Sequence, residues 1–164
     1  MTSAASPAAS SASQPLLTPV DAAFADRVRD SFARQPFMAL MGAQMVAVTP
    51  GQVEIVLPYG EGVTQQLGYF HGGAIGAIAD SAGGYAAFTL FPANSSVLTV
   101  EYKINIMAPG QGERLVAVGE VVRSGRTLTI ARVEVFAERA GVRTHCATST
   151  QTLFCLHGRS DARA

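Results

Sequence analysis

The sequence predicts an α+β domain in which an antiparallel sheet curls around one long central helix, and three observations lead to this class. First, residues 71–91 (HGGAIGAIADSAGGYAAFTLF) are almost all small or apolar, as in a helix that is buried on most sides. Second, four strand-like segments with short turns between them follow, at 96–107, 114–123, 127–138 and 142–156. Third, the chain has 164 residues, 48% of them hydrophobic, which is enough for one domain with a sizeable core. A sheet of successive hairpins packed on one helix is a two-layer α+β domain.

The composition argues against several classes of protein. The 12 basic and 12 acidic residues give a formal net charge of zero, whereas a general nucleic-acid-binding surface carries a basic excess. Cys146 and Cys155 have neither metal-ligand spacing nor a small secreted scaffold around them, so free thiols and no metal site are expected. The N-terminus has no basic segment followed by an apolar one, so no secretory signal is expected and the cytoplasm is the default compartment.

The elements before the central helix are predicted from capping and turn signals. Residues 1–17 are mostly Ala, Ser and Pro and are expected to form a disordered tail, because they offer little apolar surface to bury. The following segment predicts a helix with Thr18 as its N-cap, an apolar stripe at i, i+4 spacing, and Pro36 as its end. Residues 43–49 and 52–57 alternate around a Pro-Gly turn and predict a hairpin.

The strands after the central helix are separated by Pro-Gly, Ser-Gly and Ala-Gly pairs, so each strand is expected to pair with the next. The third of them offers four apolar residues for the core: Leu128, Ile130, Val133 and Val135. No internal repeat is visible. Residues 18–156 are therefore predicted to form a single domain, with residues 157–164 as a frayed tail.

Asp80 is the single carboxylate of the central run and is expected to lie inside the domain. A buried carboxylate is costly unless it is hydrogen-bonded or neutral, so Asp80 is either a satisfied structural acid or part of an active site. Each glycine of the same run weakens a helix by about 1 kcal/mol relative to Ala, which indicates the close approach of another backbone or a ligand. A membrane span is disfavoured, because Asp is costly at a helix centre and no Lys or Arg flanks the run.

Three stretches carry a family likeness. Residues 65–73 (QQLGYFHGG), with Asp80 eight residues after the first glycine of HGG, resemble the hotdog-fold acyl-CoA thioesterases of the PaaI (phenylacetate-pathway) type. The pattern in that family is Asn or Gln, a Gly three residues later, His-Gly-Gly, and then an acid at this distance. Residues 99–109 and 123–126 resemble the strand and the hairpin that follow in that family. The resemblance covers about residues 38–156.

The resemblance implies hydrolysis of an acyl-CoA thioester, with no cofactor other than the coenzyme A of the substrate. It gives a catalytic carboxylate to Asp80, an N–H donor for the thioester carbonyl to Gly72, a positioning amide to Gln65, a hydroxyl to Thr99 and a supporting role to His71. It also places four residues at the substrate: Gly73, Arg123, Ser124 and Arg126. A free N–H near a helix N-terminus suits a developing oxyanion on physical grounds as well. The acid can act as a general base or as a nucleophile, and the sequence leaves both open.

Spacing along the helix bears on the number of chains in such a site. Eight helical residues span about 12 Å, so Gly72 and Asp80 of one chain cannot contact the same carbonyl. If both act, they come from different chains, and a two-fold dimer with antiparallel central helices forms two such composite sites. The resemblance implies the same dimer, joined edge to edge near residues 96–107, and leaves open whether two dimers pair.

One position departs from the family pattern. Some relatives carry Ser or Thr four residues after the acid, where this chain has Gly84, so that hydroxyl would have to come from elsewhere, such as Thr99. Arg143 and Lys103 are further candidates for contact with the phosphates of coenzyme A, since Arg suits phosphate bidentately. His145, on the last predicted strand, is expected to be structural.

The predicted function is hydrolysis of an aryl- or medium-chain acyl-CoA to the free acid and coenzyme A. One alternative is a hotdog domain that binds acyl-CoA as a sensor or regulator without hydrolysing it; the presence of Asp80 and the lack of a helix-turn-helix segment disfavour it. Another is a hydratase or dehydratase, whose paired His and acid motifs are not found. The shape of the acyl pocket, and with it the preferred acyl group, depends on how five apolar side chains pack: Phe37, Met38, Met41, Leu67 and Phe88.

Overall fold

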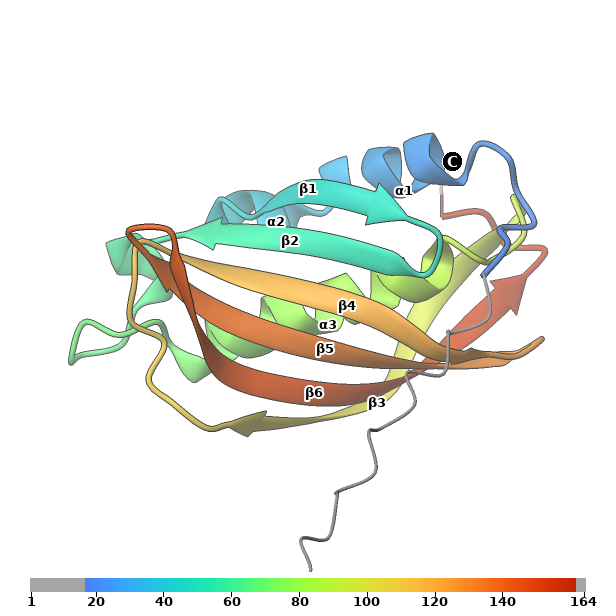
Figure 1. Cartoon of the computed structure of the whole chain (residues 1–164). Helices are drawn as coiled ribbons and strands as arrows, with labels where there is room; N and C mark the ends of the chain where they lie inside the picture. The colour runs from blue at the N-terminus through green and yellow to red at the C-terminus, as the bar shows by residue number, and fades with distance from the viewer. Residues whose placement is uncertain (1–16, 162–164) are drawn as a thin grey trace, which may run out of the picture.

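A six-stranded antiparallel sheet curves around one long helix in the computed structural model of the chain, which describes residues 17–161 (Figure 1). The expected N-terminal tail lies outside the described residues except for Leu17, as do the last three residues of the expected C-terminal tail. Asp161, the last described residue, forms an ion pair with Arg34 at 3.0 Å. The predicted class, an α+β domain with a sheet wrapped around a central helix, is confirmed.

The strand order in the sheet is β1-β2-β4-β5-β6-β3. The strands span β1 (Gln44–Thr49), β2 (Gln52–Pro58), β3 (Ser95–Ile106), β4 (Arg114–Ser124), β5 (Leu128–Arg139) and β6 (Val142–His157). The hairpins β1–β2, β4–β5 and β5–β6 are confirmed. The expected pairing of β3 with β4 is wrong, because β3 pairs with β6. A tight hairpin needs a loop of about two to five residues. The segment 107–113 is longer, and it leads from β3 to β4, which lies next to β2.

The central helix α3 (Gly72–Phe88) lies on the concave face of the sheet and is buried along most of its length. Two close contacts explain why glycine is needed where the helix meets the sheet. A Cβ on Gly119 of β4 would collide with the Ala82 carbonyl, and a Cβ on Gly83 would collide with the side-chain oxygen of Gln151. Gln151 is itself buried, and its Nε2 donates to the Ala79 carbonyl at 2.8 Å. This bond fixes the helix against β6 one residue before Asp80.

The N-terminal helix begins later than predicted. Helix α1 spans Phe24–Ala33, and Thr18 does not cap it. Instead, the carboxylate of Asp21 accepts from the Ala23 N–H at 2.9 Å and from Arg27 Nε at 2.8 Å, which builds a turn ahead of the helix.

A second short helix, α2 (Pro36–Met41), follows at once and was not predicted. Proline suits the first position of a helix, so Pro36 begins α2 rather than only ending α1. Gly42, with φ of 76°, ends it.

The inner face of β5 differs in part from the prediction. Val133 and Val135 are fully buried, as expected, but Leu128 is 49% exposed and Ile130 is only half-buried. Side chains alternate between the two faces of a strand, so residues of even and odd number cannot share the core. Thr129 and Ala131 take the inner positions instead.

Neither cysteine is paired in the structure, as predicted. Cys146 and Cys155 are buried free thiols on β6, and burial raises the pKa of both. Within residues 17–161, no helix is long and apolar enough to cross a membrane.

Candidate active site

The first turn of α3 offers one backbone donor that its own chain leaves free. His71 is the N-cap, and its Nδ1 accepts from the Gly73 N–H at 2.8 Å. A backbone N–H can only donate, so Nδ1 is the acceptor in this bond. The His71 carbonyl accepts from Ala74 and Ile75. The Gly72 N–H has no acceptor among the described residues, and it points out of the positive end of the helix.

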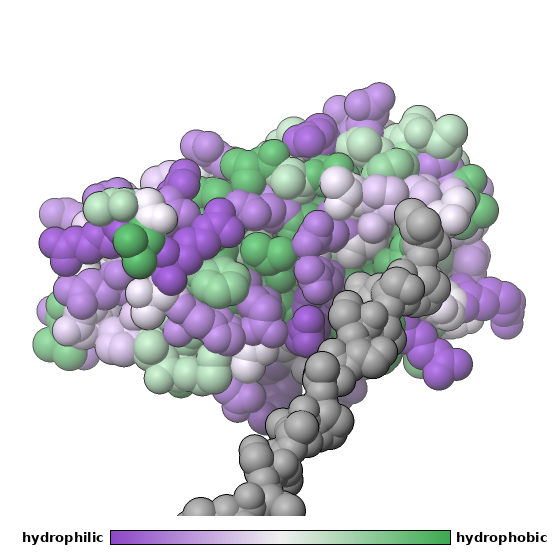
Figure 2. Space-filling view, in the orientation of Figure 1, coloured by the Kyte–Doolittle hydropathy of each residue, from purple (hydrophilic) through white to green (hydrophobic). Residues whose placement is uncertain are grey.

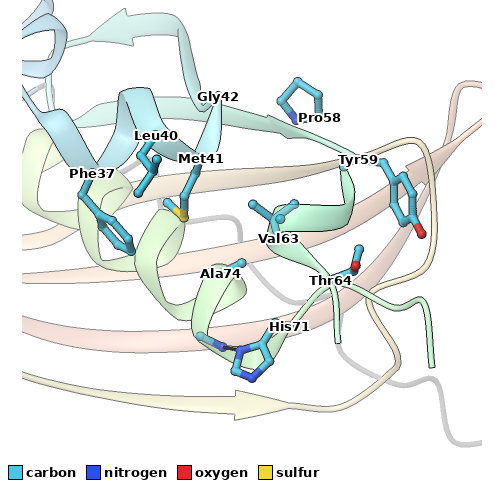
Figure 3. A pocket seen from close by; sticks show the side chains of 13 residues that line it. Phe37, Leu40, Met41, Gly42, Pro58, Tyr59, Val63, Thr64, His71 and Ala74 are labelled. Atoms are coloured by element: carbon cyan, nitrogen blue, oxygen red, sulfur yellow. Dashed lines mark hydrogen bonds between the residues drawn. The ribbon is translucent and has the colours of Figure 1, made fainter. Parts of the chain in front are cut away.

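An open cleft of about 730 Å³ lies beside this turn (Figure 3). Its walls come from α2, from the segment after β2 and from the start of α3. The residues that line it are Phe37, Leu40, Met41, Gly42, Pro58, Tyr59, Gly60, Gly62, Val63, Thr64, His71, Gly73 and Ala74. Ligand pockets of this size are usually apolar with a few polar groups, and this cleft follows that pattern.

The predicted catalytic carboxylate lies elsewhere on the same helix. Asp80 Oδ1 accepts a hydrogen bond from Thr99 Oγ1 at 2.7 Å. Thr99 precedes an irregularity in the pairing of β3 with β6, where the register shifts between Thr99 and Glu101. Bulges of this kind often re-aim a side chain next to an active site. The structure therefore brings together two of the predicted residues, which lie 19 positions apart in the sequence.

Asp80 is partly exposed, so the expectation that it lies inside the domain is wrong for the single chain. The sheet covers the opposite side of α3, and Asp80 faces the edge strand β3, where the coverage ends. Asp80 is also absent from the lining of the open cleft. The donor and the carboxylate are therefore in two separate places, as the spacing of about 12 Å along the helix requires.

Gln65 lies in the loop before α3 with its carboxamide turned back on its own loop. Its Oε1 accepts a short hydrogen bond from the Leu67 N–H, and its backbone N–H donates to the Tyr69 carbonyl at 2.9 Å. Gly68, with φ of 79°, makes this tight loop possible. Gln65 does not line the open cleft in this structure.

The predicted substrate-binding residues of the β4–β5 hairpin lie at the far end of the sheet. Arg123, Ser124 and Arg126 are exposed, and the Arg126 carbonyl is bonded to His157 Nε2 at 2.7 Å. Strand β4 begins opposite Pro58, beside the cleft, and its 11 residues carry the chain about 35 Å away. Within one chain, these arginines are thus remote from both Gly72 and the cleft.

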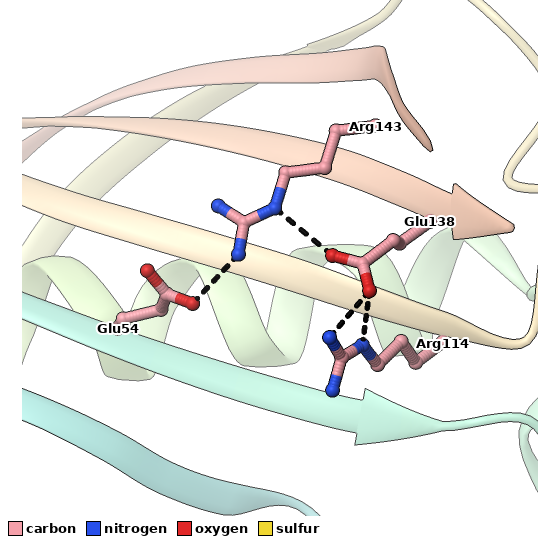
Figure 4. Close-up of polar contacts among 4 residues, drawn as sticks. All are labelled: Glu54, Arg114, Glu138 and Arg143. Atoms are coloured by element: carbon pink, nitrogen blue, oxygen red, sulfur yellow. Dashed lines mark hydrogen bonds and ion pairs between the residues drawn. The ribbon is translucent and has the colours of Figure 1, made fainter. Parts of the chain in front are cut away.

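Arg143, another candidate for phosphate contact, belongs to an ion-pair cluster on the outer face of the sheet (Figure 4). Its guanidinium pairs with Glu138 at 3.0 Å and with Glu54 at 3.0 Å, and Arg114 pairs with the other oxygen of Glu138. The hydrogen bonds from Arg143 and Arg114 hold the pKa of Glu138 below its ordinary value. Figure 2 shows hydrophilic side chains across much of this face.

The two other titratable candidates also have partners. The Lys103 ammonium donates to Asn105 Oδ1 at 3.0 Å. His145 Nε2 is 2.7 Å from a carboxylate oxygen of Glu134, and its ring packs on Phe136 with centroids 5.1 Å apart. Among residues 17–161, no group of three or more His, Cys, Asp or Glu side chains is arranged to hold a metal ion.

Most residues of the cleft wall are not predicted by the sequence. Of the five apolar residues expected at the acyl pocket, Phe37 and Met41 line the cleft. Met38 and Phe88 are buried in the core, and Leu67 is 71% exposed. The signal for α2 was present in Pro36 and Gly42, which suit the two ends of a short helix.

Comparison with known proteins shows which family and fold the chain shares. The sequence profile of the thioesterase superfamily matches residues 67–143, a segment that runs from the loop before α3 into β6. A solved thioesterase family protein from Silicibacter pomeroyi is 48% identical, with a TM-score of 0.81 over 82% of this chain and 99% of that one.

Two further proteins are more distant. A protein of Saccharolobus solfataricus, named provisionally as an esterase, is 32% identical over 94 residues, which are 57% of this chain and 66% of that protein's length. The Escherichia coli PaaI protein, from the phenylacetic acid degradation operon, has a TM-score of 0.72 over 83% of this chain and 95% of that one. At 15% identity, this last likeness shows the shared fold alone.

Proposed function

Because the chain belongs to the thioesterase superfamily and has its hotdog fold, we propose that it hydrolyses an acyl-CoA thioester, as a PaaI-type enzyme acting on an aryl- or medium-chain acyl group. The observation that carries the proposal is the free N–H of Gly72 at the positive end of α3, between His71 and Gly73, which both line the open cleft. The neighbouring Gly73 N–H is already occupied by His71, so the first turn presents a single donor in a fixed direction.

This donor suits the charge that thioester hydrolysis creates. Attack on the carbonyl carbon turns the carbonyl oxygen into an oxyanion, and the Gly72 N–H with the positive end of the helix stabilises it. The tetrahedral intermediate then expels the coenzyme A thiolate, which takes up a proton, and the free acid remains. Asp80 either removes a proton from the attacking water or attacks first, forming an anhydride that water hydrolyses. In both cases the Thr99 hydroxyl orients the carboxylate.

The complete site needs a second chain, because the donor and the carboxylate of one chain are about 12 Å apart along α3. A second copy placed edge to edge on β3 supplies the missing half. This edge strand exposes large apolar residues to an unusual degree: Leu98 (55%), Val100 (58%), Tyr102 (45%), Ile106 (49%) and the adjoining Met107 (54%). An exposed apolar edge is a liability unless something covers it. We propose a homodimer with two composite sites, and a dimer of dimers as the alternative assembly.

The same dimer gives the hairpin arginines a role. In an antiparallel arrangement, the far end of one sheet lies toward the near end of its partner, so Arg123 and Arg126 of one chain approach the cleft of the other. We propose that these arginines, with Ser124, contact the phosphates of coenzyme A. Arg143 is a weaker candidate, since Glu54 and Glu138 already hold its guanidinium.

Thiol release tests the proposal directly. The protein is incubated with acetyl-, hexanoyl-, decanoyl-, benzoyl- and phenylacetyl-CoA, and free coenzyme A is measured with a thiol reagent. We expect release well above the uncatalysed rate for at least one of them. Tight binding of an acyl-CoA by calorimetry with no thiol release would favour the non-catalytic acyl-CoA-binding alternative and would end the hydrolase assignment.

A further inference from the structure

A small recess opens beside Asp80 on the side toward the end of α3. It holds about 90 Å³, and its floor is Gly84, one helical turn after the carboxylate. Its walls are Gln35, Ser81, Tyr85, Val97 and Thr99. Since a water molecule takes up about 30 Å³ of liquid, the recess has room for about three water-sized groups.

Gly84 has no explanation within its own chain. It is buried in the middle of a helix, where glycine is among the least favourable residues, yet a Cβ added to it would meet no atom within 4 Å. Its neighbour Gly83 is the opposite case, since a Cβ there would collide with Gln151. The space that a side chain at position 84 would fill is therefore open to another group.

A second cleft of about 220 Å³ adjoins the recess, and the two share Gln35, Tyr85 and Val97 in their linings. The second cleft is also lined by Phe88, by the Ser31 hydroxyl, which lies 3.1 Å from the Tyr85 hydroxyl, and by the ion pair of Arg34 and Asp161. The space beside Gly84 is therefore the smaller of two neighbouring cavities.

An acyl-CoA has two arms on either side of its thioester carbonyl, and they have different needs. The pantetheine arm ends in a nucleotide and has to leave toward solvent. The open cleft suits it, because Leu40 is 82% exposed and Tyr59 50% exposed along its rim. The acyl arm has no such exit to reach, and its carbonyl carbon has to lie against the catalytic carboxylate. The recess beside Gly84 meets that need, because Asp80 and Thr99 both line it.

We propose that the acyl group enters the recess beside Gly84, which makes residue 84 the determinant of the size of acyl group that the enzyme accepts. This proposal rests on the proposed function. A short acyl group ends within the recess. A longer or aryl group passes over Gly84 toward Tyr85 and Val97, because no side chain at position 84 blocks the way.

The test compares kcat/KM for acetyl-, hexanoyl-, decanoyl- and phenylacetyl-CoA among three variants and the wild-type protein. The variants are Gly84→Val, Gly84→Ala and Gly76→Ala. Gly76 is the matched control: it lies one turn before Asp80 on the same helix face, and a Cβ there would make an ordinary contact of 3.5 Å with the Tyr102 hydroxyl. Melting temperatures show which variants are folded; Gly84→Ala favours the helix and keeps the test valid if Gly84→Val does not fold.

We expect Gly84→Val to lower kcat/KM by roughly 10-fold or more for hexanoyl-CoA and larger substrates, with acetyl-CoA changed by less than about 2-fold. Gly84→Ala should shift the ratio in the same direction by a smaller factor, and Gly76→Ala should leave it unchanged. A folded Gly84→Val variant with the wild-type ratio overturns the proposal. If the wild-type protein hydrolyses none of the substrates, the failure lies with the proposed function instead.

Discussion

At the scale of single residues, Asp80 is the carboxylate that we propose as catalytic, and it has few contacts. One hydroxyl, that of Thr99, donates to it at 2.7 Å, and the carboxylate is otherwise partly open to solvent in the single chain. A group held this way contributes little to the stability of the fold, since no buried charge is left unpaired when it is changed. The catalytic and structural roles of Asp80 can therefore be separated by one conservative substitution.

Asp80→Asn should abolish most turnover and leave the fold intact. The amide keeps the size of the side chain and still accepts from Thr99, but it is neither a base nor a nucleophile, so kcat should fall by roughly 10²–10⁴-fold or more. Thr99→Val should cost less, about 10-fold, because it loosens the carboxylate without removing it.

The measurement is kcat by thiol release, with the melting temperature and the Kd for acyl-CoA of each variant. Asp26→Asn, an exposed acid on α1, is the control for loss of one charge and should behave as the wild type. A well-folded Asp80→Asn variant with normal kcat would remove Asp80 from the mechanism and leave it a surface acid.

The residue types of this site could be predicted from the sequence, but their hydrogen bonds could not. The HGG motif predicts the donor, and the acid eight residues later predicts the carboxylate. The capping bond from Gly73 to His71, which leaves Gly72 as the free donor, depends on the backbone angles at the helix start. The contact between Thr99 and Asp80 lies beside a shift of register in β3. No residue pattern in the sequence predicts that shift.

Alternation and turn residues predicted each strand to within one residue at either end, because both are local properties of the chain. The pairing of β3 with β6 is not local, and its prediction failed for that reason. Helix α2 was missed because six residues are too few for a periodic signal. The late start of α1 follows from side-chain bonds of Asp21, which compete with a helical cap.

The adjacent glycines of α3 should respond to alanine in opposite directions. Gly84→Ala fills open space and improves helix propensity, so the free energy of unfolding should rise by about 1 kcal/mol. Gly83→Ala places a methyl group against Gln151 and 3.0 Å from Val133 Cγ2. The free energy of unfolding of this variant should therefore fall by about 1–3 kcal/mol.

Urea denaturation at one fixed chain concentration measures both changes. The Gln151→Ala background lacks the colliding side chain. In that background, Gly83→Ala should lower the free energy of unfolding by less than it does in the wild-type protein. If both glycine variants raise the midpoint, helix propensity alone decides, and the packing argument for Gly83 fails. If both lower it, the space beside Gly84 is not open to a methyl group.

At the scale of the whole molecule, the two groups that we propose for the site lie in different places on one chain. The free donor and the open cleft lie at the start of α3, and the carboxylate and its recess lie at the middle of the helix toward the edge of the sheet. The sequence predicted this division from helical spacing alone. It could not show that the β3 edge is apolar and exposed, since the burial of a strand depends on its neighbours in the sheet.

Complementation between two inactive chains tests the composite site. Gly72→Pro removes the donor, and proline suits this first helical position because His71 already has the extended conformation that precedes proline, with φ of −66° and ψ of 140°. A Cβ there would lie 3.2 Å from Ile106 Cδ1, a contact that a small shift relieves.

Gly72→Pro and Asp80→Asn homodimers should each be nearly inactive, since both of their sites lack one group. In the mixed dimer, one site combines an intact Gly72 from one chain with an intact Asp80 from the other, so two differently tagged chains, co-expressed and purified as the mixed dimer, should regain about half of the wild-type kcat per dimer. A mixed dimer as inactive as its parents would show that each site lies within one chain, and the composite arrangement would have to be abandoned.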